Sequence, residues 1–204
     1  GEGLFSRKEH IEKVDVSPWL LSEENWIKIG KDKVQNPWVV KGLIGMSAMS
    51  YGALGNHAVE AMSEGLGMAT GSWVNTGEGG LAKYHLAGGG DIVMQIGPGL
   101  FGVRNPEGEF DWQKFKEKAS TPEIKAFEIK IHQGAKIRGG HVEGAKVTPE
   151  IAEIRGVEPW KSIDSPNRFR QFSNSEELIN FVEKLKEKGG KPVGVKLVMG
   201  DIET

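Results

Sequence analysis

Short glycine clusters, each beside a short apolar run, are the feature that most constrains what this chain can fold into. Glycine supplies 29 of the 204 residues, about 14% against a usual ~7%. The clusters lie at 77–80, 88–90, 97–102 and 139–140, and none sits in a serine-glycine tract. Because glycine adopts positive φ and lets a ligand approach the backbone, these clusters predict tight functional loops at strand ends.

Apolar runs alternate with helical periodicity along the chain. Strands are expected at 43–50, 72–74, 92–96, 126–131 and 192–199, the first buried on both faces. One helix is expected to begin at a cap, Asn56, and to close near Gly67. Another is expected to begin at Ser173, with Glu176 completing a capping box, and to close at Gly190.

Strands that alternate with helices indicate a parallel α/β sheet, either open or closed as a barrel. A complete barrel takes ~250 residues, so this length holds about five of the eight strand–helix units. The expected fold class is therefore α/β, an incomplete (β/α)₈ TIM-barrel-type domain over residues 41–204. Residues 1–40 are expected to form an irregular N-terminal arm that packs on the barrel.

Composition excludes several classes of function. The 26 Lys and Arg residues against 28 Asp and Glu residues give a net charge of −2, which argues against nucleic acid and an anionic membrane surface as partners. The absence of cysteine excludes a disulfide scaffold, a cysteine nucleophile and a cysteine-held iron–sulfur cluster in these residues. The histidines lack ligand spacing, so no metal is expected. No apolar run approaches the roughly 20 residues that a membrane-spanning helix needs, and no signal peptide opens the sequence. A cytoplasmic location is expected.

The string GPGLFG at 97–102 has the letters of a dinucleotide-binding loop. That reading requires a helix to begin there, whereas turn residues follow and Pro98 removes one N–H donor. A structural turn or a flavin-side loop is favoured.

Three charged residues lie at or near predicted strand ends. Glu78, within its glycine loop, is either a carboxylate tuned for proton transfer or a solvated turn residue. Lys130 and Lys196 interrupt apolar strands, which is costly without an anionic partner. A ligand with delocalised negative charge, such as a reduced flavin, would provide one. Alternatively each lysine faces outward or pairs with Glu128 or Asp201.

Two further cations follow the fourth predicted strand. Lys136 and Arg155 could together hold a dicarboxylate, for which the arginine guanidinium is well suited. Ordinary surface ion pairing is the alternative.

Ten segments, in this order along the chain, resemble the FMN-binding synthase domain of the glutamate synthase family. They are IGMSAMSYGAL (44–54), NTGEGGL (75–81), YHL (84–86), GGGD (88–91), QIG (95–97), FG (101–102), EIK (128–130), QGAK (133–136), KVTPEIA (146–152) and GVKL (194–197). The resemblance implies a (β/α)₈ barrel that carries FMN at the C-terminal ends of its strands. It also implies addition of ammonia to 2-oxoglutarate, followed by hydride transfer from FMN to 2-iminoglutarate to give L-glutamate.

The resemblance also implies roles for individual residues. Those expected to bind the cofactor are Ala48, Met49, Ser50, Gln95, Lys130 and Lys196. Lys196 would also stabilise the anionic N1/C2=O edge of the flavin and so act in catalysis. Lys136 and Arg155 would hold the carboxylates of 2-oxoglutarate, and the second catalytic residue, Glu78, would lie where ammonia meets the keto carbon.

The same resemblance implies partners. The cofactor phosphate commonly lies in the loops after strands seven and eight, so the remainder of the barrel is expected from the rest of the protein or another chain. The isolated chain is therefore expected to be inactive. An NADPH-linked subunit or ferredoxin would supply electrons. The alternatives are an FMN oxidoreductase of this family that acts on another 2-oxo acid, and a non-catalytic truncated barrel fragment.

Overall fold

The structure is a computed structural model and describes residues 20–133 and 140–198. Its strands are β1 (Ile27–Ile29), β2 (Trp38–Val40), β3 (Gly45–Met46), β4 (Trp73–Asn75), β5 (Asp91–Ile96), β6 (Ile124–Lys130), β7 (His141–Val142), β8 (Ile163–Asp164) and β9 (Val193–Lys196). Its helices are α2 (Asn56–Ala69), α3 (Lys83–Leu86), α4 (Trp112–Ala119), α5 (Pro149–Arg155) and α6 (Ser175–Gly189), with short 3₁₀ turns at Glu23–Asn25 and Gly144–Lys146.

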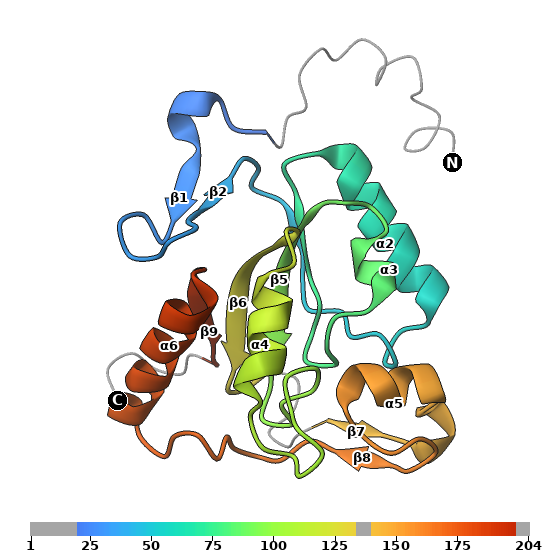
Figure 1. The fold of residues 1–204 in the computed structure, drawn as a ribbon. Helices are drawn as coiled ribbons and strands as arrows, with labels where there is room; N and C mark the ends of the chain where they lie inside the picture. The colour runs from blue at the N-terminus through green and yellow to red at the C-terminus, as the bar shows by residue number, and fades with distance from the viewer. Residues whose placement is uncertain (1–19, 134–139, 199–204) are drawn as a thin grey trace, which may run out of the picture.

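Five strands form one parallel sheet in the order β3-β4-β5-β6-β9 (Figure 1). The helices α2, α4 and α6 fall between successive strands of this sheet in the chain. Parallel strands joined through helices are the repeating unit of a β/α barrel. The prediction of an α/β, partial barrel-type domain is thus confirmed, and the barrel is not closed within the described residues.

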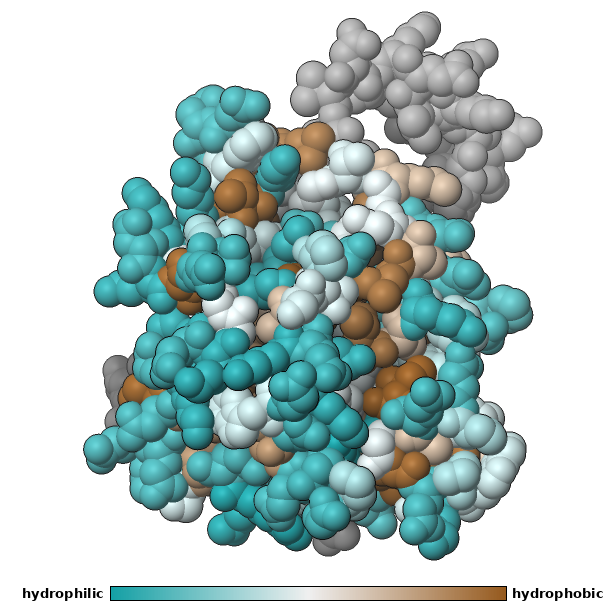
Figure 2. All heavy atoms as spheres, in the orientation of Figure 1, coloured by the Kyte–Doolittle hydropathy of each residue, from teal (hydrophilic) through white to brown (hydrophobic). Residues whose placement is uncertain are grey.

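One face of the sheet packs against helices and forms the main core. Alternate residues of β5 (Ile92, Met94 and Ile96) are fully buried there, since successive side chains of a strand point to opposite faces. They belong to one cluster with Phe115 of α4 and Leu185 of α6. The sheet face that packs against the helices is the outside of the barrel. The molecular surface seen in this orientation is largely hydrophilic, with separate apolar residues (Figure 2).

The opposite, inner face is apolar at one end and polar at the other. Near the amino ends of the strands, Val93 and Ala126 are buried against Trp38 and Val40 of β2. Two positions further along, and so on the same face, Gln95 and Glu128 lie side by side on β5 and β6. The inner face therefore becomes polar toward the carboxyl ends of the strands.

Two small antiparallel pairs cover opposite ends of the sheet. Strands β1 and β2 pair with each other at the amino end, while β7, β8 and α5 lie at the carboxyl end (Figure 1). The described part of the N-terminal arm thus contains an antiparallel pair in place of irregular chain alone. Trp38 and Val40 of β2 bury their side chains on the sheet. The division of the chain at residue 40 stays a prediction.

The first predicted strand was too long and was not buried on both faces. Only Gly45–Met46 of the predicted 43–50 is strand, and Leu43 and Ile44 are 65% and 57% exposed. Within the described residues β3 is an edge strand that pairs with β4 alone, so its apolar residues lack a second neighbour. The last strand, predicted at 192–199, is Val193–Lys196 for the same reason, with Met199 outside the described residues.

Helix ends also differ from the predictions by one or two residues. Gly55, not Asn56, is the cap of α2, and no side chain caps this helix, which runs to Ala69. Asn174, not Ser173, caps α6, and Glu177 rather than Glu176 reaches back to the Ser173 N–H. The αL conformation of Gly190 ends α6 as predicted.

The GPGLFG string forms a tight turn. Leu100 N–H donates to the Gly97 carbonyl, and Val103 N–H donates to that of Leu100. No helix begins there, because the next one in this described region is α4. The favoured interpretation as a turn is confirmed. Among the described residues, no helix has the length and apolar character needed to cross a bilayer.

Candidate functional site

A cavity of about 320 Å³ lies at the carboxyl end of the sheet. It brings together all but one of the residues singled out from the sequence: Ala48, Met49, Ser50, Glu78, Gln95, Lys130, Arg155 and Lys196. These residues come from six segments that are far apart in the chain. The remaining candidate, Lys136, lies outside the described residues.

Glycines shape the loop that carries Glu78. Gly77 has φ +66, and a Cβ at this position would overlap the Ser50 hydroxyl. A Cβ on Gly97 would overlap the Glu78 carboxylate. The carboxylate therefore packs directly on the backbone of Gly97, just after the end of β5, which explains why glycine stands at both positions.

The Glu78 carboxylate is paired, not solvated. Lys130 Nζ lies 2.7 Å from Glu78 Oε1, and both side chains are largely buried, at 13% and 15% exposure. The alternatives to a ligand contact for Lys130 were an outward orientation and a pair with Glu128, and neither is found among the described residues. A buried ion pair at a strand end requires good geometry to offset its desolvation.

Two lysines lie side by side at this rim. Lys130 and Lys196 are register partners on β6 and β9, so their side chains project from the same face. Among the described residues Lys196 has no ion pair, and its possible partner Asp201 lies outside them. With Arg155, three cations face one carboxylate, so the cavity favours an anionic ligand.

Arg155 is buried at the end of α5, with 4% of its surface exposed. Its Nη2 donates to the Tyr51 carbonyl at 3.1 Å, and its guanidinium lies 5.2 Å from the Phe101 ring centroid. Its Nε has no acceptor in the described part of the chain. Burial lowers the pKa of Arg155, and the charge of Glu78 opposes this shift. Surface ion pairing, the alternative weighed for this arginine, is not what the structure shows.

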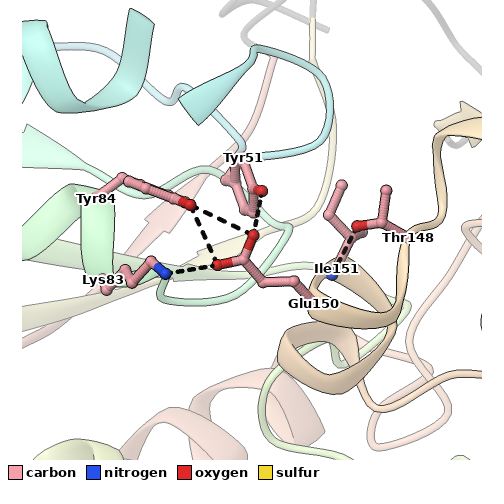
Figure 3. A network of polar contacts seen from close by, with 6 residues as sticks. All are labelled: Tyr51, Lys83, Tyr84, Thr148, Glu150 and Ile151. Atoms are coloured by element: carbon pink, nitrogen blue, oxygen red, sulfur yellow. Dashed lines mark hydrogen bonds and ion pairs between the residues drawn. The ribbon is translucent and has the colours of Figure 1, made fainter. Parts of the chain in front are cut away.

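A polar network holds α5 against the loop that lines the cavity (Figure 3). Tyr51 Oη donates to Glu150 Oε2 at 2.6 Å, Tyr84 Oη donates to Oε1 at 3.2 Å, and Lys83 Nζ lies 3.1 Å from Oε1. Burial, and then the hydrogen bond to Glu150, raise the pKa of Tyr51. Tyr51 thus contacts both ends of α5, through its hydroxyl and through the carbonyl that accepts from Arg155.

A buried histidine supports the same loop from the other side. His85, 1% exposed, accepts a hydrogen bond from Ala82 N–H at Nδ1. Its Nε2 therefore carries the proton and donates to the Met49 carbonyl at 3.0 Å. Burial lowers the pKa of His85. The sequence alone does not predict this contact between His85 and the Met49 carbonyl.

Sequence reasoning also missed the roles of Asn75 and Glu128. Glu128 Oε1 accepts hydrogen bonds from Gln95 Nε2 at 2.6 Å and Asn75 Nδ2 at 2.9 Å. A signal existed: three consecutive apolar strands each carry one amide or carboxylate close to their carboxyl end. Residues at such positions in neighbouring parallel strands meet on the sheet.

Comparison with known proteins identifies the family. The family profile described as "Conserved region in glutamate synthase" matches residues 4–204. The chain belongs to the glutamate synthase family. This match confirms the family that the sequence motifs of the glutamate synthase domain indicate. Within residues 20–133 and 140–198, no cluster of three or more His, Cys, Asp or Glu residues has the arrangement of a metal site.

Several curated members of the glutamate synthase family are similar to this chain. It is 58% identical over 202 residues to the "Glutamate synthase large subunit-like protein YerD" of Bacillus subtilis, covering 99% of this chain and 38% of YerD. It is 36% identical over 152 residues to the "Archaeal glutamate synthase [NADPH]" of Methanocaldococcus jannaschii, covering 73% and 27%. It is 33% identical over 183 residues to the "Ferredoxin-dependent glutamate synthase" of Cyanidium caldarium, covering 82% and 12%. The chain therefore spans well under half the length of these relatives.

Proposed function

We propose that this chain forms part of a flavin-dependent glutamate synthase domain. The reaction converts 2-oxoglutarate and ammonia to 2-iminoglutarate and reduces this imine to L-glutamate. The observation that carries the proposal is the convergence of Glu78, Lys130, Lys196 and Arg155 on one cavity beside buried Gln95. Such a site, at the carboxyl ends of parallel strands, is where barrel enzymes carry their chemistry.

The residues present fit the ring of FMN. Gln95 Oε1 is a buried acceptor without a donor among the described residues, and Lys196 supplies a cation without an ion pair there. Ala48, Met49 and Ser50 line the cavity from the end of β3. Lys130 and Gln95 would contact the ring, and Lys196 would lie at its anionic edge. Bound FMN would supply the hydride.

Arg155 is the residue best placed to hold a carboxylate of 2-oxoglutarate. Its guanidinium is buried beside the cavity, and its Nε has no acceptor in the described region. A desolvated arginine binds a carboxylate strongly because charge-assisted hydrogen bonds strengthen in a low dielectric. Lys136 is proposed as the second carboxylate ligand.

Glu78 would handle the protons of ammonia addition. Lys130 occupies Oε1, so Oε2, which packs on Gly97, is the oxygen that would accept a proton from the attacking nitrogen. Addition to the keto carbon followed by loss of water gives the imine. A positioned carboxylate of this kind contributes typically 10²–10⁴-fold to such proton transfers.

The remainder of the barrel and an electron donor complete the proposal. The cofactor phosphate would bind to later strands, supplied by the rest of the protein or another chain. Relatives named for NADPH and for ferredoxin support an electron-transfer partner of one of these two kinds.

A test that is independent of the electron donor uses the full-length protein reduced anaerobically by light. Mixing it with 2-oxoglutarate and ammonium should reoxidise the bound flavin and produce one L-glutamate per flavin. Neither substrate alone should do so. Glu78→Gln should slow reoxidation about 10²-fold or more. The matched control is Glu158→Gln, which makes the same change at an exposed position.

The alternatives give different outcomes. If another 2-oxo acid reoxidises the flavin and 2-oxoglutarate does not, the protein is a flavin-dependent oxidoreductase with a substrate other than the one proposed. A full-length protein that binds no flavin would overturn the proposal and favour a non-catalytic role.

A further inference from the structure

One carboxylate beneath the cavity joins two buried amide side chains. Glu128 is on β6, and its Oε1 accepts from Gln95 Nε2 at 2.6 Å and from Asn75 Nδ2 at 2.9 Å. Gln95 is fully buried, and Asn75 is 7% exposed. Gln95 lines the candidate site, whereas Asn75 and Glu128 line an apolar cavity further down the inner face. The trio therefore lies between the two cavities.

Glu128 determines which end of the Gln95 amide faces it. An ionised carboxylate only accepts hydrogen bonds, whereas an amide has a donor end and an acceptor end. The NH₂ group of Gln95 must therefore face Glu128, and its carbonyl Oε1 must point elsewhere. In the described part of the chain this Oε1 is buried and has no donor. A buried acceptor without a donor is costly, so a ligand N–H would be favoured there.

The second amide, that of Asn75, connects Glu128 to the loop that carries Glu78. Because Asn75 Nδ2 donates to Glu128, its Oδ1 is free to accept from Gly77 N–H, at 3.0 Å. Gly77 directly precedes Glu78. The backbone N–H of Gln95 also donates to Thr76 Oγ1 in this loop, at 3.1 Å. One carboxylate thus sets the orientation of a cavity amide and braces the loop that carries Glu78.

We infer that Glu128 is a positioning residue that presents Gln95 as a hydrogen-bond acceptor to a ring N–H of the cofactor. This inference rests on the proposed function. An oxidised flavin ring carries one N–H, at N3, and reduction adds an N–H at N5. Acceptance from N3 would strengthen binding in both redox states, whereas acceptance from N5 would strengthen binding of the reduced form alone.

The experiment compares Glu128→Gln with the wild type in the full-length protein. A neutral amide at position 128 can donate to Gln95 Oε1, so it removes the constraint on the Gln95 orientation. FMN affinity is measured by flavin fluorescence, and the reduction potential by spectroelectrochemistry. We expect either about tenfold weaker binding of oxidised FMN, or a potential lowered by about 30 mV, which is a tenfold loss for the reduced form alone.

The chain offers a matched control on its surface. Gln113 Nε2 donates to Glu117 Oε1 at 3.2 Å on the exposed face of α4, so Glu117→Gln makes the same change in the same kind of pair. This variant should keep the affinity and the potential of the wild type. Melting temperatures of both variants show whether the fold is retained. A change in affinity for one redox state alone is not expected from loosened packing.

Wild-type affinity and potential in a folded Glu128→Gln variant would overturn the inference. If that variant does not fold, Gln95→Met removes the acceptor and should give the same loss. Unchanged FMN affinity together with an unchanged reduction potential in Gln95→Met would equally overturn it. A wild-type protein that binds no FMN would overturn the proposed function together with the inference, whereas wild-type binding with unaffected variants overturns the inference alone.

Discussion

Two buried cations at opposite ends of the sheet differ in how their donors are used. At the amino end, Lys191 is 9% exposed, and its Nζ donates to the carbonyls of Thr121 and Ile124, at 2.9 and 2.5 Å. At the carboxyl end, Arg155 is 4% exposed and donates to Tyr51, while its Nε has no acceptor in the described region. Burial lowers the pKa of both groups.

The difference teaches that burial alone does not distinguish a structural cation from a functional one. Lys191 satisfies backbone carbonyls where a helix–strand connection needs donors, so its role is in stability. Arg155 keeps a donor available beside a cavity. This division matches the general behaviour of β/α barrels, in which the amino end of the sheet serves stability and the carboxyl end serves chemistry.

The largest expected effect tests the carboxyl-end cation. Arg155→Met in the full-length protein should lower kcat/KM for 2-oxoglutarate about 10³-fold, roughly 4 kcal/mol, because a buried charge contact to the substrate is lost. Steady-state kinetics with varied 2-oxoglutarate measure this. Lys191→Met serves as the control and should keep kcat/KM within about twofold. Comparable losses in the two variants would break the comparison.

Lys196 sharpens the comparison by separating cofactor chemistry from substrate binding. Lys196→Ala should slow hydride transfer about 10²-fold, because a cation near the developing negative charge is lost. The affinity for 2-oxoglutarate should change much less. Single-turnover reoxidation and equilibrium binding measure the two effects, with exposed Lys116→Ala as the control. Equal effects on both would assign Lys196 to the substrate contact.

At the amino end the expected effect is on stability. Lys191→Met should lower the free energy of unfolding by about 2 kcal/mol, because the buried Ile124 carbonyl loses this donor and the Thr121 carbonyl keeps only the Ile124 N–H. Urea denaturation followed by circular dichroism measures it. Lys188→Met removes a surface lysine paired with Glu187 and should change stability by well under 1 kcal/mol. An unchanged midpoint for Lys191→Met would contradict a structural role.

The smallest effect concerns the support of the cavity loop and depends on pH. Because burial lowers the pKa of His85, the unfolded chain binds a proton more readily than the folded one does. The contribution of neutral His85 to the free energy of unfolding is fully present above about pH 6.5. It is lost as the pH falls below this value, by at most about 1.4 kcal/mol per pH unit. Urea titrations at several pH values measure the slope of the unfolding free energy against pH. This slope should be smaller in His85→Gln than in the wild type, and unchanged in the control His57→Gln, which alters an exposed position. A slope identical in wild type and His85→Gln would refute it.

Much of the fold was predictable because it depends on local patterns. An apolar run between glycines correctly predicted β5 (Asp91–Ile96), and an alternating run predicted β6 (Ile124–Lys130), each to within a few residues. The ends of the sheet were less predictable. Leu43 and Ile44 are apolar enough for a central strand, yet they lie on an edge, and an edge is a property of the whole sheet.

The candidate site was predictable in membership but not in connections. The motifs pointed to Glu78, Lys130 and Arg155, and all three line the cavity. The pairing of Lys130 with Glu78, rather than with Glu128, depends on how a loop after β4 folds over β6. Sequence spacing carries no information on that approach, because 52 positions separate the two residues.

The sequence by itself determined that strands and helices alternate, where the glycine loops interrupt them, and to which family the motifs are similar. Each of these depends on neighbours within a few positions or on an ordered string of residues. Only the tertiary structure decided which charges meet, which buried donors stay free, and that Glu128 orients two amides. Hydrogen bonds and ion pairs act over about 3 Å, so they are decided by the packing that brings distant segments into contact.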